Sequence, residues 1–221
     1  MGHNCTLRTS LLPGRHPSGT SHPSSMSSDT TPAASPAAVL LQDPSFIQPF
    51  DEEHRLQVVI ETPKGSRNKY AFDHKRHVIE LKKVLPAGMV FPYDFGFIPS
   101  TLAEDGDPID VLLLMDEPAF PGCVLEARLI GVIEGEDELE GGDSQRNDRL
   151  LAVATVSHVY GELQTPDDLP APVVHQMQDF FASYPRVLRH KTYKLLGCKG
   201  PEEARKLVDE AVTRFREHQP G

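Results

Sequence analysis

The chain has 221 residues, of which 22 are basic and 32 are acidic, so its net charge is −10, and 38% of its residues are hydrophobic. A protein this acidic repels the phosphate backbone of nucleic acids, which excludes nucleic acid as an expected partner. Its apolar runs are far shorter than the ~20 residues of a membrane-spanning helix, so no membrane partner is expected either. Three widely spaced cysteines do not suit a disulfide framework and favour a reducing, cytoplasmic location.

The first part of the chain differs in composition from the rest. More than half of residues 1–38 are Ser, Thr, Pro or Gly, and large apolar residues are few. Such a segment cannot bury enough apolar surface to offset the entropy lost on ordering it. We therefore expect a disordered Ser/Pro/Thr-rich tail at residues 1–43 and a single domain at residues 44–221. A start of translation at Met26 is an alternative interpretation of the same segment.

The remaining chain carries strand patterns first and helical patterns last. Runs that alternate in polarity or are rich in Val, Ile and Leu predict strands at residues 55–61, 69–73, 77–82, 110–115, 124–134 and 150–156. The acidic, Gly-bearing segment 135–149 is expected to be a loop. Apolar residues at helical spacing predict amphipathic helices at residues 173–184 and 201–215. This order indicates a mainly β fold, a closed or nearly closed barrel with helices outside.

An acidic stretch before one predicted strand is the strongest chemical signal in the sequence. Asp105, Asp107 and Asp110 place three carboxylates within six residues, directly before the apolar run VLLLM. Carboxylates gathered at the mouth of a buried strand need cations or protons to neutralise them. Gly106 and Pro108 would tighten and stiffen the turn, and hard oxygen ligands on a rigid turn suit Mg2+ or Mn2+ better than zinc. The alternative is a solvated acidic turn with no ligand.

The stretch EDGDPIDVL resembles the signature of the soluble family I inorganic pyrophosphatases. The resemblance continues through FPYDFGFIPSTLAEDGDPIDVLLLMDEPAFPGCVLEARLIGVIEGEDE, reaches back to VVIETP and NKYAFD, and extends forward to DRLLAV, FFASY and HKTYK. It implies a five-stranded closed, OB-like β-barrel with two amphipathic helices outside. It further implies a homo-oligomeric enzyme that hydrolyses inorganic pyrophosphate to two phosphates with a metal-activated water. Mg2+ is the implied cofactor, and Mn2+ is possible.

The resemblance also assigns roles to single residues. Asp107 matches the carboxylate that accepts a proton from the attacking water, and Glu61 matches a supporting acid of the site. The other matches are metal ligands at Asp105, Asp110 and Asp137, and phosphate-binding residues at Lys69, Lys83 and Tyr184.

Several positions depart from the family pattern, and they cluster in the same site. Hydroxyl, carboxylate or basic groups of the family are replaced or shifted at Ala71, Lys83, Phe91, Phe95, Asn147, Arg149 and Pro185. Losing hydrogen bonds to a charged phosphate slows turnover, at ~1.5–3 kcal/mol for each bond. Two alternative functions therefore stay open: a non-catalytic barrel that binds phosphate ligands or partner proteins, and a phosphatase for another phosphoanhydride.

Overall fold

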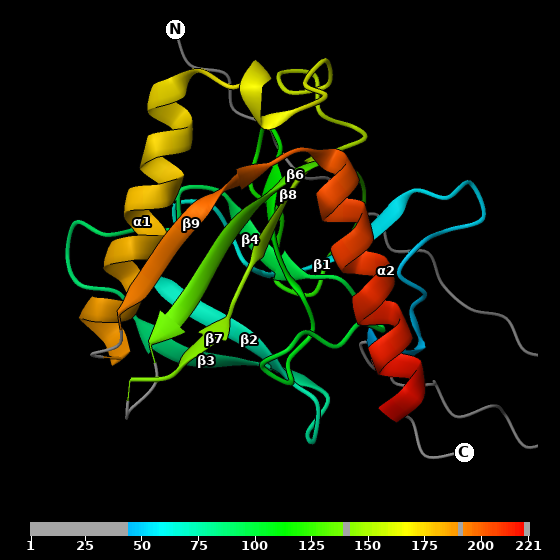
Figure 1. The fold of residues 1–221 in the computed structure, drawn as a ribbon, viewed down its shortest axis with the longest axis horizontal. Helices are drawn as coiled ribbons and strands as arrows, with labels where there is room; N and C mark the ends of the chain where they lie inside the picture. Colours follow the sequence, from blue (N-terminus) through cyan, green and yellow to red (C-terminus); the bar gives the residue numbers. More distant parts are fainter. Residues whose placement is uncertain (1–43, 139–141, 190–191, 219–221) are drawn as a thin grey trace, which may run out of the picture. The chain divides into compact units, whose positions relative to one another are not determined.

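A computed structural model describes residues 44–138, 142–189 and 192–218 of the chain, without the side chains of residues 45 and 185–189. Within this part, five strands form a closed ring through antiparallel and parallel pairings (Figure 1). In their order around the ring they are β1 (Leu56–Thr62), β4 (Asp94–Phe97), β5 (Asp110–Leu114), β8 (Arg149–Ala154) and β6 (Val124–Glu138), which pairs with β1 again. The predicted five-stranded closed architecture is therefore confirmed.

The remaining strands attach to the ring or lie beside it. β7 (Ser144–Arg146) and β9 (Tyr193–Lys199) both pair with the long strand β6. A separate two-stranded hairpin is formed by β2 (Asn68–Asp73) and β3 (Val78–Val84), and β2 contacts β1. Two short 3-10 helices, η1 (Pro44–Phe46) and η2 (Pro166–Asp168), complete the connections.

Two α-helices cover the ring, as the helical periods predict. The first, α1 (Ala171–Arg189), packs along β9, and the second, α2 (Pro201–His218), packs against β6 (Figure 1). Strand β5 is apolar after Asp110 because both of its faces are buried. Val111 and Leu113 belong to the core cluster beneath α2, whereas Leu112 and Leu114 belong to the cluster beneath α1. A strand buried on both faces needs an unbroken apolar run, which is what VLLLM supplies.

All six predicted strands are present, but three further strands were not predicted. β4 has only four residues and includes Gly96, so it has little strand signal of its own. β7 and the end of β6 lie in the segment expected to be a loop, and that expectation is wrong there because β6 continues to Glu138 and pairs with β7. The tail prediction for residues 1–43 lies outside the described residues. Among those described, no helix is both long enough and apolar enough to traverse a bilayer.

Candidate active site

One pocket gathers most of the side chains that the sequence singled out. It lies between the loop before β5, the end of β6, the start of β8 and helix α1. Six of the eight predicted site residues line it, namely Lys69, Asp105, Asp107, Asp110, Asp137 and Tyr184. The other lining residues are Phe91, Phe95, Asn147, Arg149 and Phe181. We call this the aspartate pocket.

The acidic side of the pocket is built by a tight turn and two strand ends. Gly106 has φ of +90°, a conformation that glycine adopts without strain, and it lets the Asp107 backbone N–H donate to Asp105 Oδ1 at 3.2 Å. Asp110 opens β5, and Asp137 lies near the end of β6, where it is buried. The carboxylates of the acidic stretch therefore share one pocket with an aspartate that lies 27 residues after Asp110.

The opposite side of the pocket is basic and aromatic. The Arg149 guanidinium lies between two rings, 4.5 Å from the centroid of Phe181 and 4.4 Å from that of Tyr193. Its Nε lies 4.0 Å from Asp110 Oδ2, a loose ion pair across the pocket. Lys69 Nζ lies 5.4 Å from the ring centroid of Tyr184. Cation–π attraction to these rings helps to hold the Lys69 ammonium and the Arg149 guanidinium in place. The two cations therefore lie opposite the carboxylates, and Arg149 makes only a long ion pair with them.

Three buried polar atoms of the pocket lack a hydrogen-bond partner. Within the described part of the chain, Asp137 Oδ1, Arg149 Nε and Tyr184 Oη are buried without a hydrogen bond. Leaving such atoms unpaired is costly, and native proteins rarely do so without a functional reason. All three side chains line the aspartate pocket, so the unmet polar groups mark it as a place for a charged or polar ligand.

Two predicted site residues do not line the pocket. Glu61 is buried behind it on β1, where its Oε1 accepts a hydrogen bond from the Phe72 backbone N–H at 2.7 Å. Lys83 lies opposite Lys69 on the β2–β3 hairpin and is half-buried. Glu61 therefore lies behind the pocket without lining it, and Lys83 lies at the same end of the hairpin as Lys69.

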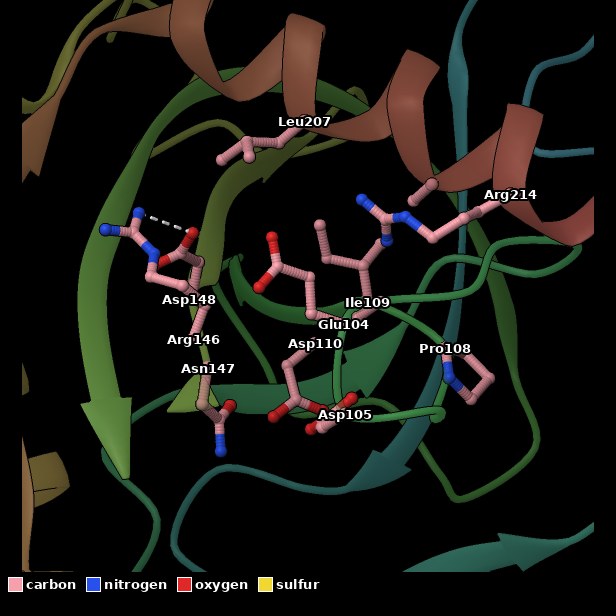
Figure 2. Close-up of a pocket in the computed structure, with 12 residues that line it drawn as sticks. Glu104, Asp105, Pro108, Ile109, Asp110, Arg146, Asn147, Asp148, Leu207 and Arg214 are labelled. Atoms are coloured by element: carbon pink, nitrogen blue, oxygen red, sulfur yellow. Dashed lines mark hydrogen bonds and ion pairs between the residues drawn. The ribbon is translucent and has the colours of Figure 1, made fainter. Parts of the chain in front are cut away.

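Asp148 does not compensate for the neutral side chain at Asn147. Its Oδ1 accepts a hydrogen bond from the Gly135 backbone N–H at 3.0 Å, and its Oδ2 pairs with Arg146 at 2.8 Å. Figure 2 shows this pair in a neighbouring pocket below α2, with Asp105, Asp110 and Asn147 at the boundary shared with the aspartate pocket. Asp148 is therefore a structural residue that anchors the turn between β7 and β8.

Comparison with known proteins places this site in a family. The family model described as inorganic pyrophosphatase matches residues 58–216. An inorganic pyrophosphatase of Synechocystis sp. is 40% identical over 161 residues, which are 73% of this chain and 92% of that protein. The chain belongs to the inorganic pyrophosphatase family. A relative from Methanosarcina mazei, also an inorganic pyrophosphatase, is 38% identical over 160 residues, which are 72% of this chain and 91% of that protein.

Solved structures of the family have the same fold. The inorganic pyrophosphatase of Thermus thermophilus superposes with a TM-score of 0.71 at 34% identity, covering 79% of this chain and 99% of that one. The enzyme of Neisseria gonorrhoeae gives a TM-score of 0.71 at 32% identity, covering 78% and 98%. The family prediction, the mainly β fold and the assignment to an enzyme family are thereby confirmed.

Burial raises the pKa of three carboxyl groups in or directly behind the aspartate pocket. Loss of solvent raises the pKa of Glu61 to about 7 and that of Asp110 to about 6, and it also raises the pKa of Asp105. The neighbouring carboxylates raise these values further, while Lys69 and Arg149 oppose the shift at Asp110. These groups therefore carry less negative charge near neutral pH than isolated carboxyls do.

The donor set fits a hard cation in its chemistry. Asp105, Asp110 and Asp137 offer only oxygen atoms, which Mg2+ and Mn2+ prefer, and Asp137 Oδ1 is buried without a partner. Over the described ranges, no three His, Cys, Asp or Glu side chains converge closely enough to form a ready-made metal site. A cation would draw together carboxylates that otherwise repel one another.

The placing of the Arg149 guanidinium between the rings of Phe181 and Tyr193 was not predicted from the sequence. The sequence identifies Arg149 only as a replacement for a family lysine, and it gives no role to Phe181 or Tyr193. Those two rings lie on α1 and β9, which meet Arg149 only in the folded chain. The one available signal was their position within the stretches FFASY and HKTYK.

Divalent cations should stabilise the protein more at about pH 8 than at about pH 5. Because the folded pKa values of Glu61 and Asp110 are raised, the stability that their protonation contributes is complete below about pH 4 and is lost as the pH rises through about 6 to 7. A cation held by this pocket would need the deprotonated groups, so its stabilising effect should grow over the same range. The measurement is the melting temperature in Mg2+ minus that in EDTA at each pH.

An equal or larger difference at the lower pH would contradict this prediction. Glu61→Gln is the control, because its amide does not titrate. Without metal, this variant should lose less stability than the parent chain between the two pH values.

Proposed function

We propose that the chain hydrolyses inorganic pyrophosphate to two phosphates and requires a divalent cation, Mg2+ or in its place Mn2+. One observation carries this proposal: the aspartate pocket sets four carboxylates against Lys69 and Arg149 and leaves three buried polar atoms without hydrogen bonds. A cation on the acidic side and phosphate oxygens on the basic side would satisfy both sets. Membership of the inorganic pyrophosphatase family supports the same substrate.

In this proposal, Asp105, Asp110 and Asp137 would hold the cation, because their oxygens line the pocket and are hard ligands. When bound, a divalent cation neutralises charge on phosphate oxygens and lowers the pKa of a water molecule. Glu61 would support the cation from behind, because its carboxyl group is close enough to Asp110 for the two to interact electrostatically.

Asp107 would accept the proton of the attacking water at a carboxylate oxygen. It lines the pocket and is exposed, while its backbone is held by hydrogen bonds: the N–H donates to Asp105 Oδ1, and the carbonyl accepts from the Ala103 N–H. A group near water and within the pocket suits proton transfer to and from solvent. No covalent intermediate on the protein is required, because phosphoryl transfer needs mainly positioning and charge stabilisation.

The phosphate groups would be held by few donors. The candidate donors belong to residues that line the pocket, namely Lys69 Nζ, Tyr184 Oη and Arg149 Nε, and the latter two make no hydrogen bond in the described part of the chain. Phe91 and Phe95 contribute apolar wall without hydrogen-bond donors, and Lys83 adds positive charge from the hairpin. Binding of the phosphate groups would therefore depend on donors from three residues, without additional hydroxyl groups at positions 91 and 95. Such a pocket favours a small, highly charged substrate.

The proposal extends to assembly and location. We propose a homo-oligomer, in which an interface would cover large exposed apolar side chains such as Phe120, Val156 and Val159. A reducing, cytoplasmic compartment is supported by Cys123 and Cys198, which are free thiols in the described part of the chain.

The choice of phosphoanhydride is tested by comparing substrates at equal concentration with Mg2+. Phosphate release from pyrophosphate should exceed release from tripolyphosphate and from ATP. A pocket with donors from three residues would make few contacts with the additional phosphate of tripolyphosphate or with the nucleoside of ATP. Faster release from ATP or tripolyphosphate would assign the site to another phosphoanhydride.

A further inference from the structure

The two oxygens of the Asp137 carboxylate have different surroundings. Oδ2 accepts a hydrogen bond from Asn147 Nδ2 at 2.9 Å. Oδ1 is buried and, in the part of the chain described, has no partner. Both residues line the aspartate pocket, and Asp137 is only 8% exposed. One oxygen is thus held by the protein, and the other is left for whatever the pocket binds.

Asn147 is itself fixed on both sides of its backbone. Its N–H donates to the Gly135 carbonyl at 2.9 Å. Its carbonyl accepts hydrogen bonds from Arg149 Nη1 at 3.0 Å and from the Tyr193 hydroxyl at 3.2 Å. These two donors stack on each other, with the guanidinium 4.4 Å from the ring centroid. The peptide unit of Asn147 therefore has little freedom to move.

Gly135 makes this arrangement possible. A Cβ atom built at this position would lie 1.9 Å from the Tyr193 hydroxyl oxygen, far inside van der Waals contact. Any side chain at residue 135 would displace the ring that holds both Asn147 and Arg149. The glycine thus leaves space for Tyr193 at the back of the pocket.

We propose that Asn147 is a positioning residue that holds Asp137 with Oδ1 directed at a bound divalent cation. This inference rests on the proposed function, because it assigns the free oxygen to the cation of that site. An amide suits the role, since it donates to a carboxylate that an acidic side chain would repel. Removing the donor frees the Asp137 side chain to rotate and leaves its Oδ2 unpaired in a buried place.

The test is calorimetric titration of Mg2+ into the metal-free full chain, without substrate. Asn147→Ala should weaken Mg2+ binding by ~10-fold or more, the usual effect of removing a hydrogen-bond partner of a metal ligand. Its melting temperature in EDTA should fall by only a few degrees, as expected for one buried hydrogen bond lost, so that the variant is still folded during the titration. Gln164→Ala, which removes an exposed amide bonded to Arg128 outside the pocket, should leave Mg2+ affinity unchanged.

A double-mutant cycle separates positioning from a general structural effect. In an Asp137→Ala background, Asn147→Ala should change Mg2+ affinity by less than about twofold, because its partner is gone. Equal affinity in the parent chain and in Asn147→Ala, or a full additional loss in the Asp137→Ala background, would overturn the inference.

A second variant covers the case in which Asn147→Ala does not fold. Tyr193→Phe keeps the ring and removes the hydroxyl that holds the Asn147 carbonyl, and it should weaken Mg2+ binding measurably. Unchanged affinity in this variant would then overturn the inference. The proposed function is judged separately, since it fails if the parent chain releases no phosphate from pyrophosphate, whatever its Mg2+ affinity.

Discussion

Asp107→Asn should lower the rate of pyrophosphate hydrolysis by ~10²–10⁴-fold, the usual contribution of a general base. The amide keeps the size of the side chain but cannot take a proton from water. Affinity for Mg2+ should change little, since Asp107 is not among the proposed ligands. The measurement is the rate at saturating Mg2+ and pyrophosphate, together with a direct titration of Mg2+ binding. Glu104→Gln is the matched control, because it neutralises an exposed carboxylate of the same loop that does not line the aspartate pocket.

The expected response to added Mg2+ distinguishes Asp107 from a metal ligand. Excess Mg2+ should not restore Asp107→Asn, whereas it should partly restore Asp110→Asn, in which a carboxylate ligand has been lost and mass action compensates. Restoration of Asp107→Asn alone would show that the two roles are reversed. Normal activity in both variants would show that the acidic stretch is a solvated turn.

Gly96→Ala should lower the free energy of unfolding by about 2–4 kcal/mol. A Cβ atom at this position in β4 would lie 2.0 Å from the backbone oxygen of Val59 in β1. Backbone cannot rotate out of the way as a side chain can, so the paired strands β1 and β4 would have to separate. The measurement is the urea concentration at the midpoint of unfolding, which should fall while the dependence of the unfolding free energy on urea concentration stays unchanged. Activity should fall as well, because β1 carries Glu61 and β4 carries Phe95.

Gly197→Ala is the matched control in another strand of the same sheet. A Cβ atom there would meet only a Glu134 side-chain oxygen at 3.8 Å, which is ordinary contact. Its stability should stay within about 1 kcal/mol of the parent chain. If both variants were equally stable, the close approach of β1 and β4 would not limit the residue at position 96.

The sequence predicts those parts of the fold in which local pattern and burial agree. β5 is apolar on both faces and both helices have clear apolar stripes, so each is predicted within a few residues. β4, β7 and β9 form because a partner strand is present, and their own residues carry little strand pattern. The continuation of β6 beyond Glu134 has the same cause, since acidic residues are stabilised there by pairing with β7 and β9.

The candidate site divides along similar lines. Side chains that lie near one another in sequence, such as Asp105 and Asp107, are recognisable from their spacing. Arg149, Phe181 and Tyr193 come from three different elements, and nothing local in the sequence shows that they stack. The contact between Asn147 and Asp137 was hidden as well, because the two meet only when β6 turns back into β7.

Phosphate release from inorganic pyrophosphate by the purified full chain tests the central claim most directly. The reaction is followed with Mg2+, with Mn2+ and with EDTA, and Asp107→Asn reports any background activity. The proposed function predicts release with Mg2+, abolished by EDTA and lowered ~10²-fold or more in Asp107→Asn. No release with either Mg2+ or Mn2+, from protein shown by its melting curve to be folded, would contradict it.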